Sequence, residues 1–275
     1  MYRCLNPGAV GVNLPWKKCL PLAHKNGFEG VDVDVDPSQP ASYYADALAA
    51  HGLRPGGAGL PVDFRGDAQK FEDGLAALEP LAARAAEVGV TRFATWILPF
   101  SDTMALPENF RFHAERLGKA ARILAGHGCS LGLEFIGPKT IRKGHKYPFV
   151  RTMEPMLDLA AAAGPNVGLL LDSWHWYTSL GTVEDVLALE PGQVVYVHVN
   201  DAPAGIPVDE QVDNVRRLPG ETGVEDVAGF LGALRTIGYD GPVVPEPFVK
   251  ELGELPPEEA IRRTGRALGS VWPRP

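Results

Sequence analysis

The 275-residue chain has few cysteines and no long apolar run. Its three cysteines, Cys4, Cys19 and Cys129, are odd in number and form no CxxC pair, which argues against a disulfide scaffold or a structural zinc site and fits a reducing cytoplasm. No stretch approaches the roughly 20 apolar residues of a membrane-spanning helix. The N-terminus lacks the basic segment and apolar run of a signal peptide. We therefore expect a cytoplasmic protein without a membrane partner.

Positive charge is also scarce, because 26 Lys and Arg residues face 34 Asp and Glu residues, for a net charge of −8. Such a chain is a poor candidate for binding a nucleic acid or an anionic membrane. No GxGxxG motif follows the first apolar run, which weakens a dinucleotide-binding interpretation. The 25 prolines and 31 glycines are scattered, and no linker divides the chain. The sequence predicts one domain over residues 1–275 that acts on a small molecule.

Short apolar runs alternate with Ala- and Leu-rich segments of helical period, which is typical of repeated βα units and a parallel sheet. Several runs, such as VGLLLD and VVYVHV, are nearly continuous in apolar residues, as in strands buried on both faces. Eight strands are predicted at 3–10, 30–35, 57–62, 92–98, 130–136, 167–172, 194–200 and 242–246. Helices are predicted at 42–52, 71–89, 109–128, 154–164, 182–190, 224–238 and 257–268. Eight strands with intervening helices in a chain of this length predict an α/β fold, a single (β/α)8 TIM barrel.

Polar side chains end the last four apolar runs. Strand five ends with Glu134, strand six with Asp172, strand seven contains His198, and strand eight ends with Glu246. In a barrel the C-terminal ends of the strands form one mouth, where active sites lie. Successive members are separated by about one βα repeat, so four consecutive strands deliver them to the same place.

Three carboxylates and one imidazole suit Mn²⁺, Mg²⁺, Co²⁺ or Zn²⁺, and the set is too acidic for a structural zinc site. Each residue alone has a simpler explanation. Glu134 fits a buried partner of an arginine, and Asp172 fits a helix N-cap. His198 fits a satisfied core histidine, and Glu246 fits a rim residue. These explanations must all hold together on four successive strands, so the pattern favours one divalent metal ion.

These residues resemble the xylose-isomerase-like TIM barrels, a group with sugar (phosphate) isomerases, epimerases of the D-tagatose 3-epimerase type, inosose isomerases and dehydratases, and endonuclease IV. The resemblance covers most of the chain and is strongest over 131–248. Its more specific parts are the DxxH motif at 172–175 and RRLPGETG at 216–223. The resemblance implies that Glu134, Asp172, His198 and Glu246 bind Mn²⁺ or a similar ion.

The resemblance also implies substrate contacts. His175 and an arginine before the PG turn would contact substrate oxygens, with Arg216 at the family spacing and Arg217 as the alternative; a surface ion pair is the simpler explanation for either. Asn200 is a further candidate. PGETG departs from the usual PGxG, which leaves the geometry of this loop open. Lys139 begins a cationic loop that suits a substrate phosphate or carboxylate, or equally a solvated lid. Trp96 is a candidate wall for a sugar face, although large aromatics more often pack.

The implied chemistry is proton abstraction beside the carbonyl of a sugar-like substrate, with Glu134 and Glu246 as bases and the metal as Lewis acid. Return of the proton to the other face gives an epimer, return to the neighbouring carbon an isomer, and loss of a β-hydroxyl a dehydratase or other lyase. An endonuclease IV-like phosphodiesterase is disfavoured because strands three and four lack its extra histidines. A non-catalytic sugar-binding subunit is the other alternative. Relatives are often dimers or tetramers, so a homo-oligomer stays open.

Overall fold

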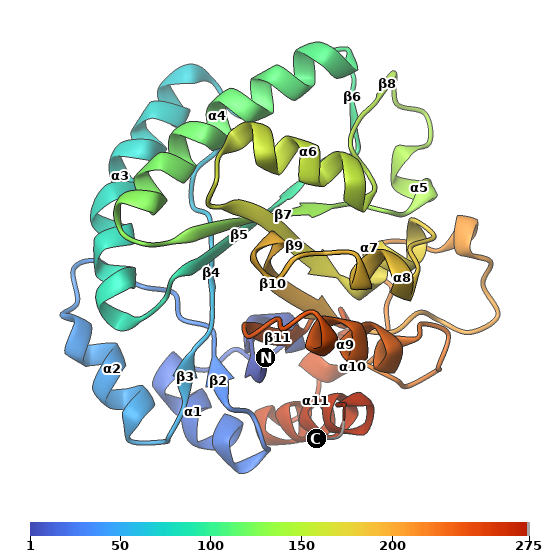
Figure 1. Ribbon diagram of the computed structural model, residues 1–275. Coiled ribbons are helices and arrows are strands. Elements are labelled where there is room, and N and C mark those ends of the chain that lie inside the picture. The colour runs from blue at the N-terminus through green and yellow to red at the C-terminus, as the bar shows by residue number, and fades with distance from the viewer. Residues whose placement is uncertain (274–275) are drawn as a thin grey trace.

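Nine strands of the protein form one parallel sheet that curves into a barrel, with helices on its outer side (Figure 1). The computed structural model describes residues 1–273. The barrel strands are β1 Tyr2–Leu5, β2 Gly30–Val31, β3 Arg54–Pro55, β4 Ala58–Gly59, β5 Arg92–Ile97, β7 Ser130–Phe135, β9 Val167–Asp172, β10 Val194–Val199 and β11 Pro242–Pro245. Their order in the sheet is β3-β2-β1-β11-β10-β9-β7-β5-β4. The two end strands of this order are consecutive in the chain, which confirms the predicted TIM barrel.

The third barrel strand is broken into β3 and β4 by Gly56 and Gly57. Residues of β3 pair with β2, whereas Ala58 of β4 pairs with Phe93 of β5, so each piece joins a different neighbour. Both glycines pass close to side chains inside the barrel. A Cβ on Gly56 would overlap the carboxylate of Asp32, and a Cβ on Gly57 would overlap the ring of Tyr196.

All eight predicted strand regions are found, but the early ones are shorter than expected. The run predicted at 3–10 ends at Leu5, because the Asn6–Pro7 step leads into a 3₁₀ turn, and proline has no N–H for a ladder. The run predicted at 30–35 pairs only at Gly30–Val31. The third lies at 54–59, rather than the predicted 57–62. The four later barrel strands, β7, β9, β10 and β11, match the predictions within one residue at each end.

The helices that surround the barrel include all seven predicted ones. In chain order they are α1 Trp16–Lys25, α2 Ala41–Ala49, α3 Ala68–Val88, α4 Leu106–Gly126, α5 Lys139–Arg142, α6 Met153–Ala163, α7 Ser173–Thr178, α8 Val183–Leu187, α9 Val227–Thr236, α10 Lys250–Gly253 and α11 Pro257–Val271. Helix α3 ends at Gly89, whose φ of 89° is the left-handed conformation that glycine adopts freely at a helix end. The C-terminal helix α11 packs beside α1 and completes the outer ring (Figure 1).

The main core lies between the barrel and the helices, where the apolar faces of the strands meet those of α3, α4, α6 and α9. A smaller group of side chains fills the barrel interior: Tyr2, Cys4, Leu170, Tyr196 and Val244. An antiparallel pair, β6 Phe100–Ser101 and β8 Tyr147–Pro148, forms a separate ribbon after β5. Within residues 1–273, no helix is both long and apolar enough to cross a membrane.

The register of the sheet brings the ends of the later strands to one level. Glu134 on β7 lies opposite Trp96 on β5. His198 on β10 lies opposite Asp172 on β9, and Val199 lies opposite Pro245, the residue before Glu246. The parallel pairing therefore delivers the predicted residues to the same end of the barrel.

Candidate metal centre and substrate cavity

Four side chains from consecutive strands converge at the barrel mouth. His198 Nδ1 lies 3.3 Å from Glu246 Oε2, 3.6 Å from Glu134 Oε1 and 3.9 Å from Asp172 Oδ2. One potential ligand atom from each of the four residues lies within 4.8 Å of all the others. We call Glu134, Asp172, His198 and Glu246 the ligand cluster.

Local structure fixes the carboxylate of Asp172. It is the N-cap of α7, where its Oδ1 accepts a hydrogen bond of 2.7 Å from Trp174 N, while its Oδ2 faces the cluster. Asp172 can therefore act as an N-cap through Oδ1 and as a metal ligand through Oδ2 at the same time. Asn200 is fully buried behind it, and its Nδ2 donates to Asp172 Oδ1 at 3.0 Å and to the Glu246 carbonyl at 3.4 Å.

The charges and burial of the cluster favour a bound cation. Burial raises the pKa of Glu134 to about 7, and the neighbouring Asp172 adds to the effect. Burial alone would lower the pKa of His198, but Glu246 and Glu134 outweigh it and raise that pKa well above its usual range. Glu134 Oε1 and His198 Nδ1 are buried without a hydrogen-bond partner. Buried polar atoms are seldom left unpaired, which indicates a bound group at this point.

The donor set fits a divalent cation. Its members are hard carboxylate oxygens and one imidazole nitrogen, which suit Mn²⁺, Mg²⁺, Co²⁺ or Zn²⁺. Bonds of about 2.0–2.2 Å to a common ion place neighbouring ligand atoms about 3–3.5 Å apart. The spacings of 3.3 to 3.9 Å around His198 Nδ1 are close to this range.

A buried arginine lies against the cluster. Arg216 Nη1 lies 2.8 Å from Asp172 Oδ2 and 3.2 Å from Glu246 Oε2, while Nη2 lies 2.9 Å from Asp213 Oδ1. Burial would raise the pKa of Asp172, but the Arg216 charge, together with His198 and the Trp174 N–H, outweighs it and lowers that pKa to about 2. His175 Nε2 lies 3.3 Å from Arg216 Nη2, and burial lowers the pKa of His175 to about 4, so this imidazole is neutral.

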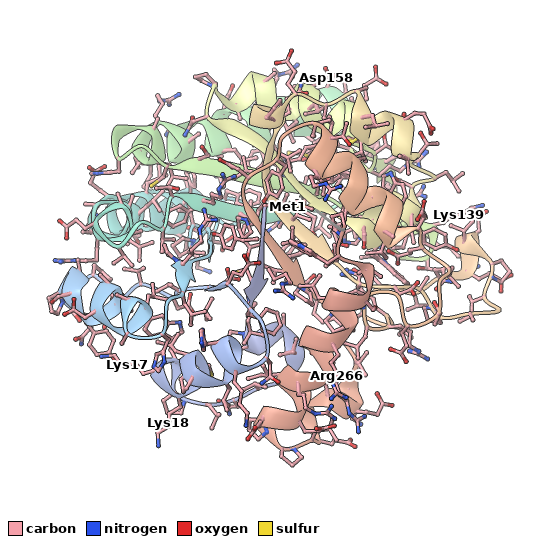
Figure 2. All side chains as sticks on the ribbon, turned by 60° about the horizontal axis from the view of Figure 1, so that its bottom comes forward. Met1, Lys17, Lys18, Lys139, Asp158 and Arg266 are labelled. Atoms are coloured by element: carbon pink, nitrogen blue, oxygen red, sulfur yellow. The ribbon has the colours of Figure 1, made fainter. Side chains whose placement is uncertain are left out.

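The other predicted substrate residues lie at different places. The Arg217 side chain donates to the Arg216 carbonyl and lines a surface cavity beside α10, so of the two arginines Arg216 reaches the cluster. Lys139 is exposed, pairs with Asp209 Oδ2 at 2.6 Å and points away from the barrel at the edge of the molecule (Figure 2). Trp96 is 46% exposed at the mouth, with the Arg65 guanidinium 4.0 Å from its ring centre.

A cavity of about 180 Å³ opens next to the cluster, and we call it the mouth cavity. Three members of the cluster line it, together with residues of the first half of the barrel: Asn6, Asp32, Thr95 and Trp96. Tyr196 also lines it, and its hydroxyl donates to Asp32 Oδ2 at 2.5 Å.

Asp32 was not among the predicted site residues. Like Glu134 and Glu246, it is a carboxylate at the end of a barrel strand, because β2 ends at Val31. In the sequence it stands in VDVDVD, where two further aspartates, Asp34 and Asp36, hide the position of the strand end. Knowledge of where pairing stops would have identified it.

Comparison with known proteins gives the family of the chain. A family model described as xylose isomerase-like TIM barrel matches residues 20–270. A Bacillus velezensis protein named inosose isomerase is 25% identical over 98% of this chain and 97% of its own length. A Pseudomonas aeruginosa protein named 3-dehydroshikimate dehydratase is 34% identical, over 49% of this chain and 22% of its own length.

Solved structures agree with the fold. A xylose isomerase domain protein from Alicyclobacillus acidocaldarius covers 98% of both chains with a TM-score of 0.84 and 29% identity. The IOLI protein, solved with a binding zinc atom, also covers 98% of both chains, with a TM-score of 0.81 and 22% identity. Together with the barrel and its convergent cluster, the matched family model places this chain in the xylose isomerase-like TIM barrel family.

Proposed function

We propose that the protein is a metal-dependent sugar isomerase or epimerase that removes a proton next to the carbonyl of an inosose or a keto-sugar. The observation that carries this proposal is the convergence of two carboxylates, Glu134 and Glu246, within 3.6 Å of His198 Nδ1 in the lining of one cavity. The relative named inosose isomerase, which matches over nearly the whole chain, supports this substrate class.

Glu134, Asp172, His198 and Glu246 would hold the ion. Mn²⁺ is our first choice, and Zn²⁺ is the main alternative, since the similar IOLI structure carries zinc. When bound, the ion supplies Lewis-acid stabilisation of oxygens that gain negative charge as the proton leaves.

The proton steps fall to the two glutamates. Removal of a weakly acidic C–H proton needs a base on one face, and an epimer results when a second group returns a proton to the other face. Glu134 and Glu246 flank His198 and line the mouth cavity, so each has access to a bound substrate. Neutral His175 and the fixed charge of Arg216 would bind substrate oxygens beside them.

A dehydratase is the second candidate. The same proton removal leads to loss of water when a hydroxyl stands β to the carbonyl. The relative named 3-dehydroshikimate dehydratase, which matches about half of this chain, supports this reaction. The difference lies in the substrate rather than in the ligand cluster, because one site supports both outcomes.

Solvent-deuterium exchange tests the role of the glutamates. We expect Mn²⁺-loaded protein in D₂O to exchange the proton next to the carbonyl of an inosose, as followed by NMR. Loss of a catalytic acid–base group typically costs about 10²–10⁴-fold in rate, so Glu134→Gln and Glu246→Gln should exchange at least a hundredfold more slowly. Glu115→Gln, at an exposed position on α4, is the control. Retained exchange in both site variants would remove these residues as bases.

A further inference from the structure

The mouth cavity continues into the first half of the barrel. A second cavity of about 260 Å³, which we call the side cavity, shares Asn6, Asp32, Ala58 and Gly59 with it. The side cavity extends past Asp34 and Trp16. A ring substrate with its carbonyl at the ligand cluster would therefore direct its far end toward the ends of β1, β2 and β4.

The far end of this space is acidic. Among residues 1–273, the linings of both cavities contain no lysine or arginine. A divalent ion and Arg216 would bring three positive charges to the three carboxylates of the cluster, and Asp213 also pairs with Arg216, so no positive charge is left over. Asp32 and Asp34 then remain, and both line the side cavity.

The carboxylate of Asp32 is held in a fixed position. Its Oδ2 accepts from the Tyr196 hydroxyl at 2.5 Å, and its Oδ1 accepts from Gly57 N at 2.8 Å and from Cys4 Sγ at 3.6 Å. Burial raises the pKa of Asp32, but the Tyr196 hydroxyl and the Gly57 N–H act against this shift, and three donors with no acceptor around it favour the ionised carboxylate. Its own carbonyl accepts from Trp16 Nε1 at 2.9 Å.

This carboxylate retains capacity for a ligand. Two carboxylate oxygens offer about four acceptor sites, and the three protein donors leave room for another donor. Asp32 is only partly buried and borders both cavities. A sugar hydroxyl can donate to it, whereas a carboxylate or phosphate cannot donate and meets like charge.

We propose that Asp32, assisted by Asp34, determines specificity: it accepts a hydrogen bond from a far hydroxyl of an uncharged polyol ring and excludes substrates that carry a carboxylate or phosphate there. This inference rests on the proposed function, since that function places the carbonyl at the ligand cluster. It favours an inosose over 3-dehydroshikimate, whose carboxylate would face Asp32 and Asp34.

Calorimetric titration measures the binding preference directly and does not depend on catalytic turnover. The Mn²⁺-loaded protein is titrated with an inosose and, separately, with 3-dehydroshikimate. We expect the inosose to bind at least tenfold more tightly, and Asp32→Asn to reduce this preference by about tenfold, the factor that corresponds to a change near 1.4 kcal/mol. Asp34→Asn, at an exposed position in the lining of the side cavity, should reduce it by a smaller factor. Asp46→Asn, exposed on α2, is the control and should leave it unchanged.

Three results would overturn the inference. They are equal or tighter binding of 3-dehydroshikimate by the wild type, a preference that survives both Asp32→Asn and Asp34→Asn, and failure of both ketones to bind. The proposed function fails by a different measurement, namely absence of deuterium exchange in a bound inosose. Selectivity in binding without exchange would therefore support the specificity role and reject the isomerase.

Discussion

Single residues at this site carry charges whose states depend on burial, and Glu225 is the clearest case outside the ligand cluster. It lies in the loop before α9, is 3% exposed, and neither of its carboxylate oxygens has a hydrogen-bond partner. Burial raises the pKa of Glu225 to about 8, and the Ser173 hydroxyl offsets only part of this effect. The residue is therefore largely protonated at neutral pH in the folded protein.

This shift makes stability depend on pH. The pKa is higher in the folded state than its ordinary value of 4.5, so between pH 4.5 and 8 the folded state holds a proton that the unfolded state releases. The free energy of unfolding from this group therefore falls as the pH rises through that window. Glu225→Gln keeps the shape and removes the titration.

We expect the melting temperature of Glu225→Gln, relative to wild type, to increase from pH 5 to pH 8. A relative gain of about 1–2 kcal/mol corresponds to a few degrees for a chain of this size. Thermal unfolding of metal-free protein at both pH values measures it. Glu221→Gln, at an exposed position in the same loop, serves as the control. A difference that stays constant or shrinks with pH would contradict the assignment of a proton to Glu225.

Among the elements, the broken third strand has a strict steric requirement at its two glycines. Ala58 and Gly59 pair with β5 while Arg54 and Pro55 pair with β2, and the two glycines between them leave space for Asp32, Cys4 and Tyr196. A Cβ on Gly56 would lie 2.6 Å from Cys4 Sγ and overlap the Asp32 carboxylate. The two glycines therefore make room for the hydrogen bonds of Asp32 inside the barrel, while the strand pieces on either side of them keep the barrel closed.

Gly56→Ala should destabilise the protein by about 1–3 kcal/mol, the usual cost of forcing extra volume into a packed interior. Gly59→Ala is the matched control, because a Cβ there has no heavy atom within 4 Å. Urea unfolding of both variants gives the comparison. Equal stability of the two would show that the interior side chains move aside at little cost.

Elements were predictable where burial leaves a strong pattern. Strands β7 and β9 are buried almost throughout, so their continuous apolar runs identify them. Helix α1 was not predicted, since Pro21 lies inside it and its polar residues obscure the helical period. Helix α7 was not predicted either, because SWHWYT is buried nearly all round and shows no polar face.

The same contrast holds for the candidate site. The ligand cluster was predictable because each member ends or interrupts an apolar run on a strand of known order. The part of the cavity wall formed by Asp32 and Tyr196 was not, because the hydrogen bond between them joins residues 164 positions apart. Contacts of this kind depend on how the barrel closes, and local sequence patterns do not report it.

At the scale of the whole molecule, the ligand cluster ties together four neighbouring strands, β7, β9, β10 and β11. An ion that binds only the folded state stabilises it, by about 2.7 kcal/mol when its free concentration is 100 times its dissociation constant. For a chain of this size, that gain corresponds to roughly 5–10 °C in melting temperature.

We therefore expect Mn²⁺ to raise the melting temperature and EDTA to reverse the change. Amide hydrogen exchange should slow most in the four strands that end in the cluster, and less in β1 to β4. The Glu134→Gln and Glu246→Gln double variant provides the comparison, with a much smaller response to the ion. Protection that is uniform over all the barrel strands, or identical in the double variant, would argue against a site held by this cluster.

The cavity walls come from two halves of the chain, with the ligand cluster after residue 130 and the proposed selective wall, around Asp32 and Asp34, before residue 60. Mutations in the early loops can thus change which molecule is accepted without altering the groups that react with it. A barrel arranged in this way can acquire new substrates in evolution, or by directed mutagenesis of 6–16 and 32–36, while its reactive centre is inherited intact.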